Sequence, residues 1–170
     1  KYLVLISEPN NQFSLKNMIL LNDEGSKKYS IDMSLFLSLI LYYNYNNIDT
    51  IYIVGTLYLH GAIVKQNINK AIQYIWLAAN QNYEKALIEL GNLYYLGQYM
   101  ATDIKSALYY YNKAADLNNS QAQEIIGMIY YMGTYVPCDI KKSIYYFTKS
   151  ANQGNDNSQT MLGYIYTFKD

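Results

Sequence analysis

The sequence predicts a mostly all-α fold, an α-α superhelix (solenoid) of stacked helix pairs, and three observations lead to this prediction. A pattern repeats at a spacing of 36 residues, as in DIKSALYYYNKAA and DIKKSIYYFTKSA, which begin at Asp103 and Asp139. Apolar residues within each unit are spaced by three and four positions, which is the period of an α-helix. Glycines recur in register, at Gly55, Gly91, Gly127 and Gly163 and at Gly61, Gly97 and Gly133. Such a repeat indicates a solenoid, because each unit buries its apolar face against the next.

The composition is that of a packed protein. The chain has 170 residues, 51% hydrophobic and 15% charged, so it can build a core. Thirteen lysines balance thirteen acidic residues and arginine is absent, which argues against nucleic acid as a partner. The longest largely apolar run, 35–43, is far short of the roughly 20 residues that a membrane helix needs, so no membrane association is expected.

The cysteine content and the amino-terminal sequence bear on localisation. Cys138 is the only cysteine, so no intrachain disulfide can form, which fits a reducing compartment. No signal peptide is evident. We therefore expect an intracellular, cytoplasmic protein.

Each unit is expected to form two helices. In the middle unit the first helix spans about Glu84 to Leu96, and Gly97 is expected to end it, because glycine accepts the left-handed conformation of a C-terminal cap. The second helix follows Asp103, whose carboxylate is placed to accept hydrogen bonds from the free amides of the first turn. Alanines on one face of this helix let the two helices approach closely, and tyrosines fill the remaining space.

The repeats are expected to cover 48–170, with units at about 50–85, 86–121 and 122–157 and a partial unit at 158–170. Residues 1–47 do not match the repeat. In this segment, Tyr2 to Ser7 and Asn17 to Ile31 have the character of strands that would include a β-hairpin, and Asp32 to Tyr43 has that of a helix. We favour an atypical cap that covers the end of the solenoid. The alternative is a remnant of another module, since strand, turn, strand and helix are similar to the opening of a BTB-type domain.

The repeated positions resemble a known family. The middle unit has the pattern A-x3-LG-x2-Y-x2-G followed by D-x2-KA-x2-Y-x3-AA, with serine in place of the lysine. The positions are Ala86, Leu90, Gly91, Tyr94, Gly97, Asp103, Ser106, Ala107, Tyr110, Ala114 and Ala115. This pattern resembles the Sel1-like repeat, which is related to the tetratricopeptide repeat. The resemblance implies a right-handed superhelix of antiparallel helix pairs that serves as an adaptor or scaffold for protein complexes, without chemistry of its own. Some secreted members carry a disulfide in every repeat, and this chain departs from them.

Few residues could carry chemistry, and we expect no catalytic site, no metal site and no cofactor. His60, the only histidine, aligns with apolar residues of later units, so we expect a packed, hydrogen-bonded side chain. Without a second histidine, two-histidine zinc sites cannot be assembled. Asp103 and Asp139 occupy one position of successive units, where Asn67 stands in the first. Asparagine caps a helix but cannot act as an acid or base, so capping explains this series.

A candidate binding surface remains when the packing positions are removed from the first helices. In helical solenoids the first helix of each pair tends to line the concave side. We call the remaining residues the first-helix stripe: Tyr52, Thr56, Leu59, Ile88, Asn92, Tyr95, Glu124, Met128, Tyr131, Thr160 and Tyr164. Its mixed composition, rich in tyrosine, is typical of protein-binding surfaces. The alternative is that these tyrosines only pack the repeats against one another.

The sequence therefore predicts a non-catalytic scaffold or adaptor that binds a protein partner of unknown identity through the concave face. One alternative is a substrate-recognition adaptor of a ubiquitin ligase, with a BTB-like amino-terminal part. A second is a structural subunit of a larger assembly, where the near-zero net charge and exposed tyrosines would favour self-association. A third is an enzyme of small substrates, which would depend on His60 or Asp103.

Overall fold

The computed structural model describes residues 37, 40–42, 44, 46–62 and 64–168. The chain divides into two compact units, Lys1–Asn44 and Tyr45–Asp170. In the first unit, residues 37 and 40–42 are helical, within the segment for which a helix is expected. The strands expected at Tyr2 to Ser7 and Asn17 to Ile31 lie outside the described residues, and so does the choice between a cap and a module remnant for residues 1–47.

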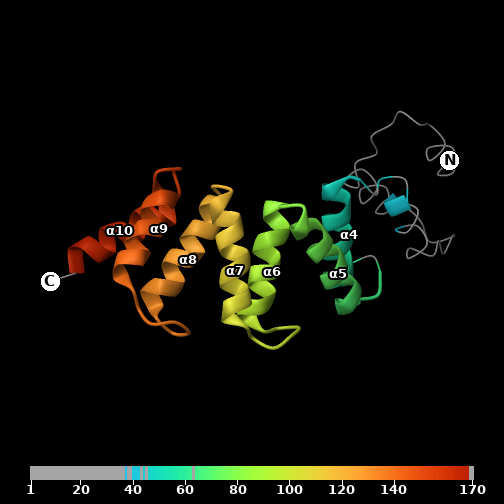
Figure 1. Ribbon diagram of the computed structural model, residues 1–170, viewed down its shortest axis with the longest axis horizontal. Helices are drawn as coiled ribbons and strands as arrows, with labels where there is room; N and C mark the ends of the chain where they lie inside the picture. The colour runs from blue at the N-terminus through green and yellow to red at the C-terminus, as the bar shows by residue number, and fades with distance from the viewer. Residues whose placement is uncertain (1–36, 38–39, 43, 45, 63, 169–170) are drawn as a thin grey trace. The chain divides into compact units, whose positions relative to one another are not determined.

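The second unit is a stack of helices that follow one another in chain order (Figure 1). Every regular element described in this unit is a helix, which confirms the predicted all-α solenoid. The helices are α4 (Ile48–His60), α5 (Ile68–Asn80), α6 (Glu84–Leu96), α7 (Ile104–Asp116), α8 (Ser120–Met132), α9 (Ile140–Ala151) and α10 (Asp156–Phe168).

Helices that are adjacent in the sequence are also neighbours in space. The most extensive packing joins the first and second helix of a repeat: α4 with α5, α6 with α7, and α8 with α9. The second helices α5, α7 and α9 then pack against the first helix of the following repeat. This is the nearest-neighbour stacking expected of a solenoid. None of the described helices is both long enough and apolar enough to cross a membrane.

The helix ends agree with the signals in the sequence. Oδ1 of Asp103 accepts hydrogen bonds from the backbone amides of Lys105 and Ser106 at 3.0 and 3.2 Å, so the predicted N-cap of α7 is confirmed. Gly97 ends α6 in the left-handed region with φ of 65°, which confirms the predicted C-terminal stop. The chain then returns to the same helix, because the amide of Asp103 donates to the carbonyl of Tyr94 at 2.9 Å.

A glycine in each of the first helices α4, α6 and α8 receives a large side chain from the second helix of the same repeat, and we call this position the glycine slot. Gly91 in α6 lies under the ring of Tyr111 in α7, and a Cβ atom at Gly91 would lie 2.5 Å from Cδ1 and 2.9 Å from Cζ of that ring. Only glycine permits this approach. Tyr111 is 1% exposed, and its hydroxyl donates to Oδ1 of Asn92 at 2.8 Å. The equivalent slots pair Gly55 with Ile75 and Gly127 with Phe147.

A pair of stacked tyrosines accompanies each slot. Tyr94 of α6 stacks on Tyr110 of α7, with ring centroids 5.8 Å apart and planes within 7°. The equivalent pairs are Tyr58 with Tyr74, at 6.0 Å, and Tyr130 with Tyr146, at 6.4 Å. Second helices are also linked to each other, because the Tyr146 hydroxyl donates to Oδ1 of Asn112 at 3.0 Å.

Candidate protein-binding surface

The structure distributes the first-helix stripe over α4, α6, α8 and α10, with unequal exposure. Leu59 and Ile88 are buried, at 1% and 7% exposure, so they offer a partner almost no surface. The half-buried members are Tyr52, Thr56, Asn92, Tyr95, Glu124, Met128 and Tyr131, and the exposed members are Thr160 and Tyr164. Nine of the eleven stripe residues therefore contribute solvent-accessible surface to the stripe.

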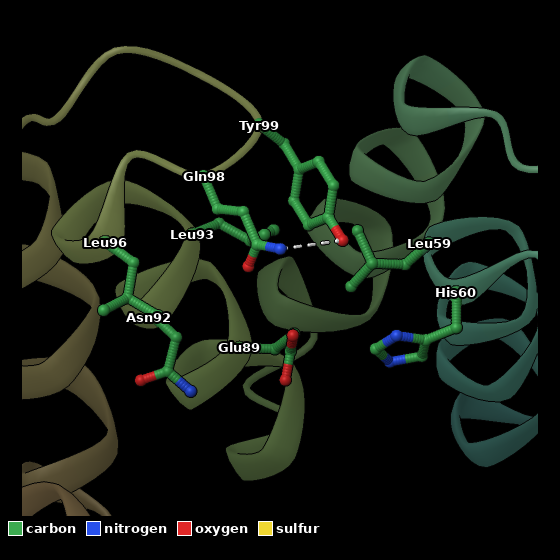
Figure 2. A pocket seen from close by; sticks show the side chains of 8 residues that line it. All are labelled: Leu59, His60, Glu89, Asn92, Leu93, Leu96, Gln98 and Tyr99. Atoms are coloured by element: carbon green, nitrogen blue, oxygen red, sulfur yellow. Dashed lines mark hydrogen bonds between the residues drawn. The ribbon is translucent and has the colours of Figure 1, made fainter.

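A hollow of about 240 Å³ lies between the end of α4, the face of α6 and the loop that follows α6. We call it hollow 1 (Figure 2). Leu59, Leu93 and Leu96 supply apolar lining, while Asn92 and Glu89 supply polar groups. In Figure 2 the Glu89 carboxylate extends between Asn92 and the imidazole of His60. The loop contributes Gln98 and Tyr99, whose side chains are joined by a 3.3 Å hydrogen bond.

A second hollow, of about 200 Å³, lies between α8, the start of α9 and α10, and we call it hollow 2. Tyr131, Tyr164 and Phe168 line it. These three residues stand 72 positions after Leu59, Asn92 and Leu96 of hollow 1, so the two hollows occupy the same register two repeats apart.

Aromatic rings also lie at the equivalent junction between α6 and α8. Tyr95 occupies the register of Leu59 and Tyr131, and its ring contacts Tyr135 of the loop after α8, edge to face at 5.5 Å. At hollow 2, Tyr131 contacts Tyr164 edge to face at 6.4 Å. The stripe tyrosines therefore pack between repeats and also border the hollows. A role in packing the repeats does not exclude a role in binding a partner.

The prediction for His60 was wrong. The side chain is exposed at the mouth of hollow 1 instead of being packed. Its equivalents Leu96, Met132 and Phe168 are also exposed. The physical reason is that each of these residues is the last of its helix, where no neighbouring helix covers it. In three repeats this residue directly precedes the glycine that caps the helix. That position in the sequence indicated that the side chain would be exposed at the helix end.

Charges are divided between the two sets of helices, although the chain is neutral overall. The first helices carry five acidic residues and one lysine: Asp49, Glu84, Glu89, Glu124, Asp156 and Lys85. The second helices carry six lysines and one acidic residue: Lys70, Lys105, Lys113, Lys141, Lys142, Lys149 and Asp116. The surface that contains the stripe is therefore acidic relative to the surface of the second helices.

Most acidic side chains of the first helices have partners at or near the start of the next first helix. The acceptor–donor pairs are Asp49 with Tyr83, Glu84 with Asn119, and Glu124 with Asn155 and Asn157. Glu89 differs, because its carboxylate lines hollow 1 without such a hydrogen bond. Its charge adds to the effect of burial in raising the pKa of the Tyr52 hydroxyl. Burial and Tyr135 likewise raise the pKa of Tyr95, so both tyrosines stay neutral near pH 7.

The remaining residues that could carry chemistry are acidic side chains, helix-capping residues and Cys138. Across 46–62 and 64–168, no three histidine, cysteine, aspartate or glutamate side chains come close enough to hold a metal ion. Asn67 and Asp139 cap α5 and α9 as Asp103 caps α7, which confirms capping as their structural role. Cys138 is exposed, and its thiol contacts the carbonyl of Tyr131 at 3.3 Å.

Comparison with known proteins identifies the repeat. The family model described as Sel1 repeat matches residues 49–83, 84–119 and 120–155, more than half of the chain. The chain belongs to the Sel1 repeat family. Sel1 repeat proteins generally act as non-catalytic scaffolds for protein interactions. No curated protein sequence matches the chain.

Solved structures of bacterial Sel1 repeat proteins share this fold. The Sel1 repeat protein from Oxalobacter formigenes is 28% identical with a TM-score of 0.70, over 76% of this chain and 54% of that one. A protective antigen of uropathogenic Escherichia coli with an SLR fold is 25% identical with a TM-score of 0.69, over 77% and 29%. Cysteine-rich protein B of Helicobacter pylori is 25% identical with a TM-score of 0.59, over 81% and 99%. This chain thus spans about half of the first protein and under a third of the second.

Proposed function

We propose that this Sel1 repeat protein is a non-catalytic scaffold that binds a segment of a partner protein along the first-helix stripe. The observation that carries the proposal is the recurrence of a hollow in one register, between α4 and α6 and again between α8 and α10. Stripe residues line both hollows, and a segment lying across the first helices would meet both of them. Hollows bordered by aromatic and aliphatic side chains suit the anchor residues that dominate protein interfaces.

The division of charge supports a basic partner segment. A lysine or arginine that enters hollow 1 would lay its aliphatic stem along Leu96, which is 65% exposed, and bring its cation to Glu89. The described residues that line hollow 2 include no acidic side chain, and Tyr131, Tyr164 and Phe168 border it, so it suits an apolar or aromatic side chain. We therefore propose a segment that carries a basic residue for hollow 1 and an apolar residue for hollow 2.

The first test is capture of partners from source cells with three forms of the chain, identified by mass spectrometry. The wild type is compared with a stripe variant that carries Tyr95→Ala, Met128→Ala and Tyr131→Ala. The control variant carries Tyr109→Ala and Tyr145→Ala. These two tyrosines lie on the second helices and are 55% and 54% exposed, so the same kind of side chain is removed away from the hollows. Circular dichroism establishes that all three forms keep their helices.

The expected result is a defined protein that the wild type and the control variant recover and the stripe variant loses. Binding of that protein to purified wild-type chain should weaken as salt rises, and Glu89→Gln should weaken binding and reduce the salt dependence. If the stripe variant and the control variant recover the same proteins, the stripe is only a packing surface and the proposal fails.

The alternatives predict different observations. A ubiquitin-ligase adaptor depends on residues 1–47, and a complete BTB-type sequence in the same polypeptide would favour it. A structural subunit would self-associate, so a constant molar mass by light scattering across concentrations would count against it. An enzyme would lose activity on a small substrate with His60→Ala or Asp103→Asn while keeping its fold.

A further inference from the structure

The interface between the two helices of a repeat is built three times in the same way. In each copy the second helix places one large side chain in the glycine slot of the first helix. These side chains are Ile75, Tyr111 and Phe147, each at most 1% exposed. The residue before each of them is a tyrosine that stacks on a tyrosine of the first helix. A second helix therefore contacts a first helix at two features, the glycine slot and the stacking tyrosine.

In α10 the same positions are present, but no second helix among the described residues packs on them. Gly163 occupies the slot position, and no atom of the described chain lies within 4 Å of where its Cβ would stand. Tyr166 occupies the stacking position and is 66% exposed, whereas the equivalent Tyr58 of α4 is 6% exposed. Leu162 is half-buried, while the residues at its position in the three earlier first helices are fully buried. α10 thus presents one half of an established interface.

We propose that the face of α10 around Gly163 and Tyr166 binds an α-helix with the side-chain pattern of the second helices. That pattern is a tyrosine followed by a large apolar residue, with small residues three or four positions away on both sides, as in α7: Ala107, Tyr110, Tyr111, Ala114 and Ala115. The large apolar side chain enters the empty slot over Gly163, and the tyrosine stacks on Tyr166. The small residues let the backbones approach, as they do inside the repeats.

This face is separate from the stripe. Gly163 and Tyr166 are three positions apart and share one side of α10. Tyr164 and Phe168 are four positions apart on another side and line hollow 2. A helix docked on Gly163 therefore leaves hollow 2 to its own partner, and the two proposals fail or succeed independently.

The occupant is a helix that is not already packed within a folded repeat. A second folded copy of this chain could not easily supply it from α5, α7 or α9. The second helices α5, α7 and α9 already hold their large side chains in the slots of their own repeats. A second copy would have to open one of its repeats to supply such a helix. This opening would expose a fully buried large side chain to water, which is unfavourable.

The test uses the full chain and a fluorescent peptide of residues 139–152, which spans the cap and helix of α9. Binding is followed by fluorescence anisotropy. In the chain, Gly163→Leu fills the slot. Asn157→Leu is the control, because Asn157 is exposed and lies seven positions before Tyr164, on the side of α10 away from Gly163. In the peptide, Phe147→Ala removes the side chain that enters a slot. Tyr145→Ala is the control, because Tyr145 points to solvent in the folded repeat.

We expect saturable binding of the peptide to the wild-type chain. Gly163→Leu and Phe147→Ala should each weaken it about tenfold or more, because an anchor residue in a fitted pocket is lost. The two control substitutions should change it less than about threefold, as expected of peripheral contacts. Absence of saturable binding would overturn the proposal, and so would equal effects of Gly163→Leu and Asn157→Leu. Self-association of the chain that the peptide does not displace would show instead that a second copy covers this face.

Discussion

The glycine slots make a prediction in which one substitution has opposite effects at two equivalent positions. Gly91 and Gly163 stand in the same register of α6 and α10, but only Gly91 lies under a covering side chain. Replacing glycine by alanine inside a helix stabilises it by about 1 kcal/mol when nothing else changes. Gly163→Ala should therefore raise the free energy of unfolding by up to about 1 kcal/mol.

Gly91→Ala should lower it. The new Cβ would lie 2.5 Å from Cδ1 and 2.9 Å from Cζ of Tyr111, where carbon atoms in contact need about 3.5 Å or more. Because Tyr111 is buried, the ring can move only by displacing its neighbours, and such overpacking costs about 1–3 kcal/mol. Displacement of the ring also strains its 2.8 Å hydrogen bond to Asn92, worth about 1 kcal/mol. After the helix-propensity gain of about 1 kcal/mol is subtracted, a net loss of about 1–3 kcal/mol is expected.

Urea denaturation followed by circular dichroism measures both variants against the wild type. A double variant, Gly91→Ala with Tyr111→Ala, identifies the cause, because without the ring the Gly91 substitution should no longer destabilise. The reasoning is refuted if Gly91→Ala and Gly163→Ala shift the free energy of unfolding in the same direction by the same amount. It is also refuted if the cost of Gly91→Ala persists in the absence of the Tyr111 ring.

Two further predictions concern hydroxyl groups. The Ser143 and Ser158 hydroxyls are buried without a hydrogen-bond partner, so Ser143→Ala and Ser158→Ala should each stabilise the chain by about 1 kcal/mol in urea denaturation. Ser150→Ala should instead destabilise it by about 1 kcal/mol, because that hydroxyl donates to a backbone carbonyl at 2.8 Å, and equal effects at the three sites would contradict this account. Hydrogen bonds from the Ser106 side chain and amide hold the pKa of Asp103 below its ordinary value. The stability that Asp103 contributes is therefore present above that ordinary value and is lost as the pH falls through the lowered pKa. Ser106→Ala should raise the pKa of Asp103 in a carbon-13 NMR titration and move this loss to higher pH, and an unchanged pKa would contradict the role given to Ser106.

Features of the fold that depend on local chemistry could be predicted from the sequence. The cap at Asp103 and the stop at Gly97 follow from the backbone requirements of helix ends, which a single residue satisfies. Because equivalent positions lie 36 residues apart, the same assignments could then be made in the other repeats. The glycine series was also visible, but the large side chain that each glycine admits becomes known only when the two helices are placed together.

Exposure along the stripe could not be predicted, because it depends on neighbours distant in the sequence. One stripe position holds Tyr52, Ile88, Glu124 and Thr160 in successive repeats, and these side chains range from buried to exposed. The hollows likewise arise between helices of different repeats, so no single segment encodes them. The division of charge between first and second helices was present in the sequence, but the zero net charge conceals it unless the charges are sorted by helix.

The single tryptophan of this chain is a built-in optical reporter of one repeat junction. Trp76 lies on α5, close enough to Tyr110 on α7 to influence the pKa of its hydroxyl, so we expect its emission to respond to the separation of these two helices. Ellipticity, in contrast, averages over every helix. In a linear array each repeat is held only by its neighbours, so the end at α10 can unfold while the junction at Trp76 persists. If ellipticity is lost at a lower urea concentration than the change in tryptophan emission, part of the stack unfolds before the junction at Trp76. The difference between the two midpoints would then measure how far cooperative unfolding extends along the stack.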